Sequence, residues 1–200
     1  MLSRRVLSLT LGLASLPLFG LTPGTQAPDF KGTDSNGATH SLSQYRGKYV
    51  VLEWANKGCP YDQKHYLSGN MESLQKEWTG KGVVWLSVLS SAPGEQGNVT
   101  PAEENAYLKK MKAAPTAALL DPEGKIGRLY EAKTTPHMFV IDPQGKLIYQ
   151  GAIDDKPTTD FADVKTARNY LNEALNSAMA GKPVPVTTTR PYGCSVKYKD

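Results

Sequence analysis

The chain has 200 residues, and its 23 Lys and Arg against 19 Asp and Glu give a formal charge of +4. This length suits one domain with its own hydrophobic core. The basic residues are scattered along the chain, so the composition excludes the charge block that is typical of a nucleic-acid-binding surface. We therefore expect one folded domain without a nucleic-acid partner.

Residues 1–22 have the pattern of a secretory signal peptide. Arg4 and Arg5 precede an apolar run from 6 to 21 that Pro17 and several small polar residues interrupt. The run is short for a membrane span, which needs about 20 predominantly apolar residues. We expect an exported protein of the bacterial periplasm without a stable membrane anchor. The paired arginines fit both the Sec and the twin-arginine route, and the cleavage site stays open.

From about residue 28, apolar β-branched runs alternate with helical patterns. We expect strands at 48–55, 83–89, 116–121, 137–142 and 146–151, the last two as a hairpin. We expect helices at 60–78, 100–111, 126–132 and 163–179, with a capping box at the start of the second. This order predicts an α/β domain over 24–180, with a central mixed β-sheet and helices on both faces. The Pro- and Thr-rich tail, 181–200, either wraps over the domain or stays mobile.

The chain has two cysteines, Cys59 and Cys194. Cys59 lies where a buried strand gives way to a helix, and Pro60 suits the first helical turn. Because a helix N-terminus stabilises negative charge, we expect Cys59 to have a lowered pKa and partial exposure. The alternative is a buried, inert cysteine. In an oxidising compartment the two cysteines can pair.

Several stretches occur in the order found in thioredoxin folds: APDF (27–30), the strand ending in Trp54, the Cys59-Pro60 helix start, and TTPHMFVIDPQGKLIYQG (134–151). Over 24–180 the chain resembles the alkyl hydroperoxide reductase / thiol-specific antioxidant (redoxin, peroxiredoxin-like) family of the thioredoxin superfamily. CPYDQKHY, LSVLSSAPGEQG and GCSVKY resemble a bacterial peroxiredoxin-like group with one cysteine at the first thioredoxin position. The resemblance implies a thioredoxin-like fold.

The resemblance also implies roles for particular residues. Cys59 would be the attacking thiol, and Pro136 a cis-proline against the reactive sulfur, with Thr135 offering backbone groups to an incoming thiol or disulfide. From the residues alone, Pro136 reads as an ordinary proline at the start of a strand. The residues expected to bind substrate or shape the site are Trp54, Asn56, Pro60, Thr135, Pro136 and His137.

Two departures from the family stand beside the nucleophile. Peroxiredoxins carry Thr or Ser three residues before the reactive cysteine and Pro seven before; here these positions are Asn56 and Leu52. Asn56 can still donate a hydrogen bond to a peroxide. Thioredoxins carry CxxC, but Asp62 replaces the second thiol, which excludes a CxxC disulfide cycle. Asp62 would oppose a nearby thiolate unless it points away or accepts a proton.

Cys194 then has three interpretations. It can resolve an oxidised Cys59 by closing a disulfide, which requires Cα atoms about 4.4–6.8 Å apart. It can form a static disulfide that fixes the tail, worth up to ~5 kcal/mol by chain entropy. It can also remain unpaired on a mobile tail.

Two classes of function follow. The first is an exported thiol–disulfide oxidoreductase or antioxidant without a cofactor, in which Cys59 attacks a peroxide or a disulfide and Cys194 or an external thiol reductant regenerates it. The second is a thioredoxin-fold copper or metal chaperone, or a redox-inactive binding module. A metal would need Cys59 with His65 and His137, which lacks the close cysteine pair of known copper chaperones. We therefore predict no metal ligands. His137 is expected to be structural or, as a minority hypothesis, a proton donor to the leaving thiol.

Overall fold

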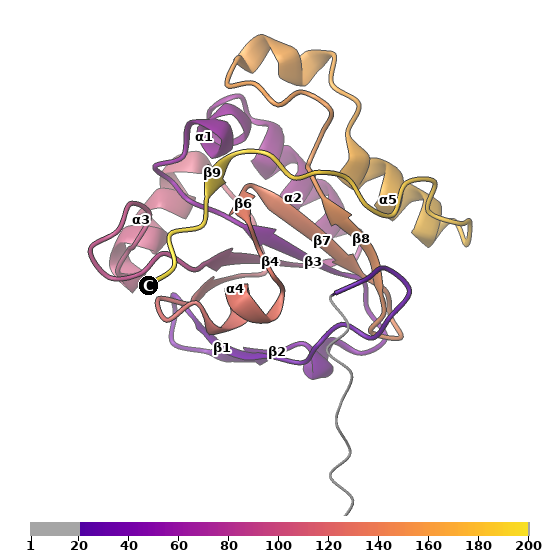
Figure 1. Ribbon diagram of the computed structural model, residues 1–200, viewed down its shortest axis with the longest axis horizontal. Coiled ribbons are helices and arrows are strands. Elements are labelled where there is room, and N and C mark those ends of the chain that lie inside the picture. Colours follow the sequence, from indigo (N-terminus) through magenta and orange to yellow (C-terminus); the bar gives the residue numbers. More distant parts are fainter. Residues whose placement is uncertain (1–20, 200) are drawn as a thin grey trace, which may run out of the picture.

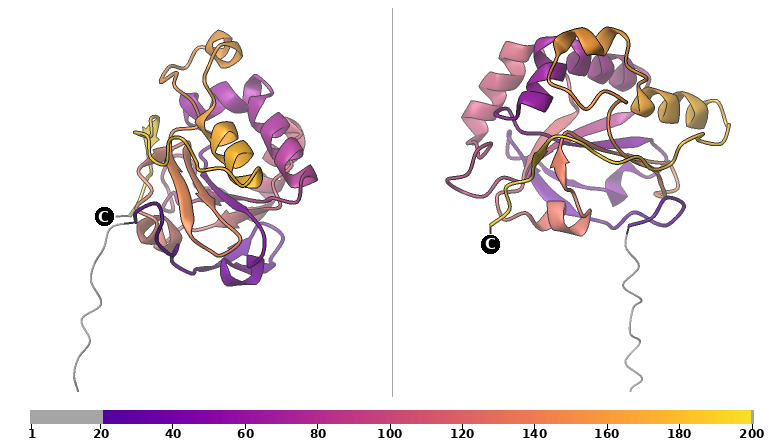
Figure 2. Two further views of the ribbon diagram at one scale, coloured as in Figure 1. Left: turned by 90° about the vertical axis from the view of Figure 1, so that its right-hand side faces the viewer. Right: turned by 45° about the horizontal axis from the view of Figure 1, so that its top comes forward.

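The computed structural model describes residues 21–199, so nearly all of the expected signal peptide lies outside the described residues. None of the helices in the described part of the chain is long and apolar enough to span a membrane. Within residues 21–199, seven strands form one mixed sheet in the order β2-β1-β5-β4-β3-β7-β8. Helices lie on both of its faces (Figures 1 and 2). The predicted fold class is therefore confirmed.

The strands are β1 (Lys31–Asp34), β2 (Thr39–Ser41), β3 (Val50–Trp54), β4 (Val84–Leu89), β5 (Ala117–Leu120), β6 (Thr134–Thr135), β7 (His137–Ile141), β8 (Leu147–Gly151) and β9 (Cys194–Ser195). The helices are α1 (Pro60–Leu67), α2 (Asn70–Gly80), α3 (Pro101–Met111), α4 (Lys125–Leu129) and α5 (Tyr170–Met179), with the 3-10 turns η1 (Ser43–Tyr45) and η2 (Phe161–Lys165). β3, β4 and β5 are parallel, whereas β7 pairs antiparallel with both β3 and β8.

The central strands are buried on both faces, which is why their sequences read as continuous apolar runs. Along β3, Leu52 and Trp54 face one core, which α4 and the segment after residue 27 close. Val51 faces the second core, built with residues of α1, α2 and α5. In Figure 2, α1, α2 and α5 lie on one side of the sheet and α4 on the other. The end of β3 that leads to Cys59 is thus fixed between two packed layers.

Two predicted helices are each interrupted. The helix expected over 60–78 is α1 followed by α2, because Gly69 between them takes a left-handed conformation, φ 82°. The helix expected over 163–179 is η2 followed by α5. Asn169 caps the N-terminus of α5, and its side chain accepts a hydrogen bond from the Asn172 N–H. Pairing within β1–β2 and β6–β9 was not predicted, because these short strands contain small polar residues without an apolar alternation.

The capping box and the hairpin are confirmed. At the start of α3, the Thr100 hydroxyl accepts from the Glu103 N–H, and the Glu103 carboxylate accepts from the Thr100 N–H. β7 and β8 form the predicted antiparallel pair.

The tail wraps over the domain, as one of the two expected alternatives required. Its residues 187–189 hydrogen-bond to Gln150 of β8, and Cys194–Ser195 then pairs with β6. In Figure 1 this yellow segment runs from α5 across the ends of β7 and β8 to the region between β6 and α1. The second cysteine is therefore brought to the first along an ordered path.

Candidate active site

Cys59 is the N-cap residue of α1, and the predicted Pro60 occupies the first helical turn. Its backbone N–H donates to the Asn56 carbonyl at 2.9 Å, which closes the turn between β3 and α1. The side chain is fully buried, at 0% exposure. The predicted partial exposure is therefore wrong, because the Thr135 carbonyl and the tail residue Cys194 both contact the sulfur, at 3.1 and 2.7 Å.

The Thr135-Pro136 peptide bond is cis, as the family resemblance implied and the residues alone did not. The Thr135 carbonyl lies 3.1 Å from the Cys59 Sγ. Thr135 belongs to β6, in which it pairs directly with Cys194 of β9. A two-residue strand beside the cis-proline therefore holds the tail in register with the sulfur.

The two sulfurs lie 2.7 Å apart, and both cysteines are free thiols. The Cys194 backbone N–H is directed at the Cys59 Sγ, 3.4 Å away. The third interpretation of Cys194 placed an unpaired thiol on a mobile tail; in the structure the thiol is free, but its segment pairs with β6. The structure brings together the two residues that a resolving disulfide requires.

A glycine allows this close approach. Gly193 has φ 130°, and a Cβ built on it would lie 2.0 Å from the Thr135 carbonyl oxygen. Any other residue would force the two backbones apart. Gly193 therefore sets how near Cys194 can come to Cys59.

The environment shifts the pKa values of the two thiols in opposite directions. Burial alone would raise the pKa of Cys59, but hydrogen bonding with the Cys194 thiol and with the backbone at Asp62 and Cys194 outweighs it, so the pKa lies below its ordinary value. Burial and the nearby Cys59 raise the pKa of Cys194 to about 12. Cys59 is thus the more acidic thiol of the pair and Cys194 the less acidic one, which is the direction predicted for a cysteine at a helix start.

Asn56 is committed to the loop instead of to a substrate. Its side-chain amide donates to the Gln96 carbonyl at 3.1 Å, and its oxygen accepts from the Gly58 N–H at 2.8 Å. Its backbone N–H donates to the Asp62 carboxylate. Donation from this amide to a peroxide is therefore not supported by the geometry, and Asn56 shapes the turn that carries Cys59.

Trp54 and His137 are core residues. The Trp54 indole packs on Tyr130 and Phe139 and donates to the Ser90 hydroxyl. The His137 ring packs against Phe139, at 4.4 Å between centroids, and its Nδ1 accepts from the Lys133 N–H. Burial lowers the pKa of His137 to about 3, so the ring is neutral. It carries no proton to donate near neutral pH as an imidazolium, which favours the structural role.

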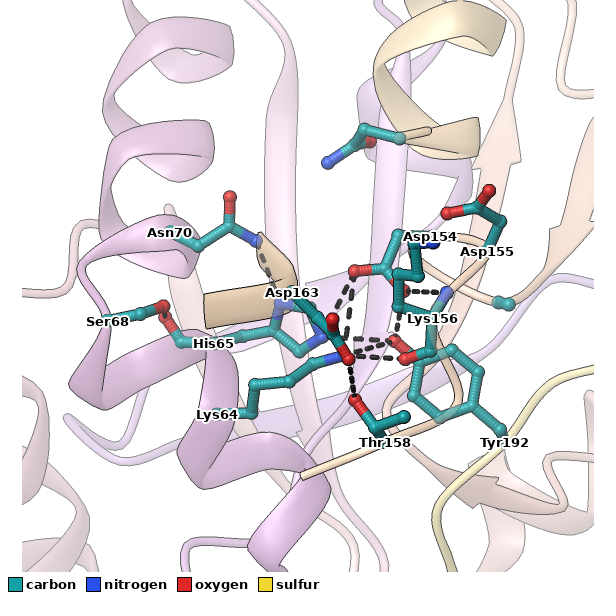
Figure 3. A network of polar contacts seen from close by, with 12 residues as sticks. Lys64, His65, Ser68, Asn70, Asp154, Asp155, Lys156, Thr158, Asp163 and Tyr192 are labelled. Carbon is teal, nitrogen blue, oxygen red and sulfur yellow. Dashed lines mark hydrogen bonds and ion pairs between the residues drawn. The ribbon is translucent and has the colours of Figure 1, made fainter. Parts of the chain in front are cut away.

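A buried polar cluster fixes the tail just before Cys194 (Figure 3). Tyr192 donates its hydroxyl to Asp154, and Lys64 of α1 donates to that hydroxyl at 3.3 Å and to the Lys156 carbonyl at 2.6 Å. The Lys64 ammonium also lies 3.7 Å from Asp154, with both side chains almost fully buried. We call Lys64, His65, Asp154 and Tyr192 the tail latch.

His65 belongs to this latch. Its Nε2 lies 3.2 Å from the Tyr192 hydroxyl, and its Nδ1 lies 2.8 Å from the Asn70 amide. Burial, and then the Lys64 charge, lower the pKa of His65 to about 3. In residues 21–199, no group of three or more His, Cys, Asp or Glu side chains is arranged to hold a metal ion.

The tail latch could not be predicted from the sequence. α1 reads PYDQKHYL, in which Asp62, Lys64 and His65 suggest a solvated face, yet all three are fully buried. The latch partners of Lys64 and His65 are Asp154 and Tyr192, about 90 and 130 residues further along the chain, and no motif connects these segments. The only local indication was a charged helix placed directly after a candidate nucleophile.

Comparisons with solved structures show the same fold. A hypothetical protein from Sinorhizobium meliloti matches with a TM-score of 0.75 at 21% identity, covering 90% of this chain and 97% of its own. A candidate thiol:disulfide interchange protein DsbE from Chlorobium tepidum matches with a TM-score of 0.58 at 25% identity, covering 80% and 99%. The exposed lipoprotein thioredoxin Etrx1 from Streptococcus pneumoniae matches with a TM-score of 0.50 at 26% identity, covering 70% and 96%.

A search of curated protein sequences finds no match. A family model, that of the AhpC/TSA family, matches residues 23–150. This span contains β3, the Cys59 helix start and the cis-proline, and it ends within the β7–β8 hairpin. With a thioredoxin-like fold around a cysteine and a cis-proline, the chain belongs to the AhpC/TSA family, a relative of the thiol–disulfide oxidoreductases.

Proposed function

We propose that the protein is an exported thiol–disulfide oxidoreductase, acting in the periplasm, in which Cys59 is the nucleophile and Cys194 the resolving thiol. The observation that carries this proposal is the placement of the two sulfurs 2.7 Å apart beside the cis-proline, by antiparallel pairing of β6 and β9. The lipoprotein thioredoxin and the DsbE-type protein among the structural neighbours support export and disulfide chemistry.

The reaction has two exchanges. The Cys59 thiolate attacks one sulfur of a disulfide R–S–S–R′, which forms Cys59–S–S–R and releases R′S⁻. Cys194 then loses its proton and attacks the Cys59 Sγ, which closes the Cys59–Cys194 disulfide and releases RS⁻. Two protein thiols are oxidised and one substrate disulfide is reduced to two thiols. An external thiol reductant reverses the protein's oxidation by the same two exchanges.

A disulfide is favoured over a peroxide as the substrate. The residue three positions before Cys59 is Asn56, whose amide is already bound to Gln96 and Gly58. Peroxide would oxidise Cys59 to a sulfenic acid, and Cys194 would condense with it to the same disulfide and water. Both substrates therefore lead to the same Cys59–Cys194 disulfide, and the rate at which each substrate forms it shows which one is preferred.

Because Cys59 is fully buried in this arrangement, β9 must leave β6 before a substrate can reach it. Cys194 is partly exposed and sits on the tail that has to move. The tail thus has two positions in the cycle: open, with Cys59 accessible, and closed, with the two sulfurs in contact.

Thiol counting with intact mass tests the proposal. The reduced mature protein receives one equivalent of oxidised glutathione or of hydrogen peroxide, and acid-quenched samples are compared with Cys59→Ser and Cys194→Ser. We expect rapid loss of both thiols without added mass, faster with the disulfide, and a lasting glutathione adduct on Cys59 in Cys194→Ser. Two thiols that stay reduced with both oxidants would reject the proposal. Stoichiometric metal that is lost in Cys59→Ser would instead support a chaperone.

A further inference from the structure

We propose that Asp62 holds and exchanges the proton that the Cys59–Cys194 pair must move during each exchange. The inference rests on the proposed function, since it assigns a residue to that same dithiol cycle. Asp62 stands at the position where CxxC proteins carry their second thiol, three residues after Cys59.

The first observation is the burial and incomplete pairing of this carboxyl group. Asp62 is 0% exposed in the first turn of α1, three residues after Cys59. Its Oδ2 accepts from the Asn56 N–H, whereas its Oδ1 has no hydrogen-bond partner among residues 21–199. A buried carboxylate with one donor is poorly compensated, and a proton removes that cost.

Another buried acid in the same core provides a comparison. Glu53 of β3 is also fully buried, but Tyr66, Gln75, Trp85 and Ser87 all donate to its two oxygens. Glu53 therefore has the hydrogen-bond partners of a structural acceptor. Asp62 lacks such a set of donors, so it is the acid of the pair that is built to take up and release a proton.

The groups around Asp62 strengthen its hold on the proton. Burial, then the charges of Glu53 and Cys59, raise the pKa of Asp62 well above its ordinary value. Glu104 acts in the same direction, and the single opposing contribution is the Asn56 N–H. The titratable groups whose charges interact with that of Asp62 are Glu53 from β3, Cys59 and Tyr66 from the α1 region, Glu104 and Tyr107 from α3, and Tyr192 and Cys194 from the tail.

This arrangement links proton release to the state of Cys59. In the reduced protein the Cys59 thiolate favours protonated Asp62. When Cys59 enters the mixed disulfide its negative charge is lost, so Asp62 becomes a stronger acid and protonates the departing R′S⁻ to R′SH. The Asp62 carboxylate then takes the proton of Cys194, whose thiolate attacks the Cys59 Sγ and expels RS⁻. Asp62 ends protonated, and charge and protons balance over the two exchanges.

The kinetic test uses Asp62→Asn, whose side chain can still accept from the Asn56 N–H but cannot carry an acidic proton. Reduced protein is mixed with excess oxidised glutathione between pH 6 and 8, and the mixed and internal disulfides are counted by mass after acid quenching. We expect closure in Asp62→Asn to be about 100-fold slower, the lower end of the range for general acid–base catalysis, and its rate to rise tenfold per pH unit as hydroxide replaces Asp62. Glu77→Gln, an exposed acid on α2, is the control and should behave as wild type.

A second measurement does not depend on the folding of that variant. In Cys194→Ser the cycle stops at the mixed disulfide, so infrared difference spectra should show loss of one protonated-carboxyl band as the glutathione adduct forms. An unchanged carboxyl region, or wild-type closure with a wild-type pH profile in Asp62→Asn, would overturn the inference and leave the proposed function intact. Wild-type protein that forms neither disulfide would overturn both.

Discussion

Replacing Gly193 by alanine should open the closed arrangement of the two cysteines. The new Cβ would lie 2.0 Å from the Thr135 carbonyl oxygen, and contacts under 3.0 Å do not persist in proteins, so the backbones must separate by about 1 Å at this point. Gly193 also has φ 130°, a conformation that costs other residues on the order of 1–3 kcal/mol.

The strain falls only on the closed arrangement, because an open tail can relax. At about 1.4 kcal/mol per tenfold, the equilibrium constant for closing the Cys59–Cys194 disulfide should fall roughly 5- to 150-fold. The attack of Cys194 on the mixed disulfide should slow in the same direction. Cys59 should become more accessible to alkylation, since the tail covers it less of the time.

Glutathione redox buffers give this constant directly from the fraction of internal disulfide after acid quenching. The matched control is Gly181→Ala, also a positive-φ glycine beyond α5, around which a Cβ would meet nothing within 4 Å. An equilibrium constant for Gly193→Ala within twofold of wild type would refute the argument that this glycine sets the approach of the tail. An equal fall in both variants would assign the effect to general backbone strain.

Three further changes test other parts of the site. Tyr192→Phe removes the hydroxyl that donates to Asp154 and should weaken tail docking by ~1–3 kcal/mol, seen as faster amide exchange over residues 192–198 with little change in α2. Burial raises the pKa of Glu104 to about 7 from 4.5. The stability that protonated Glu104 contributes is therefore full below pH 4.5 and is lost as the pH rises through 7. The urea concentration at the unfolding midpoint should fall between pH 5 and pH 8, and it should fall less in Glu104→Gln. Asp62→Cys restores a CxxC spacing and should divert oxidised Cys59 to the new thiol, so that peptide mapping finds Cys194 free; a map that shows only the original pair would contradict the assumption that this position faces the sulfur.

Much of the central sheet could be predicted because its signal is local. Buried parallel strands leave apolar β-branched runs such as 83–89, and the capping box at Thr100 identifies a helix start within four residues. The helix interruptions were harder, since Gly69 and Asn169 each act through one backbone conformation or one cap. Short strands such as β6 exist only because a distant segment pairs with them.

In the site too, features set by neighbouring residues could be predicted, whereas features set by distant segments could not. The helix start at Cys59 and the lowered thiol pKa follow from adjacent residues, and the cis peptide bond came from the family resemblance. The burial of Cys59 could not be predicted, because it depends on Cys194, 135 positions away. Gly193 and the tail latch hold Cys194 against Cys59, and neither can be recognised from the sequence around Cys59. The charged groups that act on Asp62 likewise come from β3, the α1 region and α3, and no sequence motif connects these segments.

The tail is fixed on both sides of its cysteine. Beyond Cys194, the Val196 N–H donates to the Lys133 carbonyl and the Tyr198 hydroxyl to the Ala132 carbonyl, while Arg128 lies over the Tyr198 ring. Residues 196–198 secure this second side. Loss of these contacts would leave Cys194 held only by the tail latch and by the short β6–β9 pairing, so closure of the Cys59–Cys194 disulfide should become slower and less favourable. A label attached within residues 196–198 would therefore itself perturb the position of Cys194.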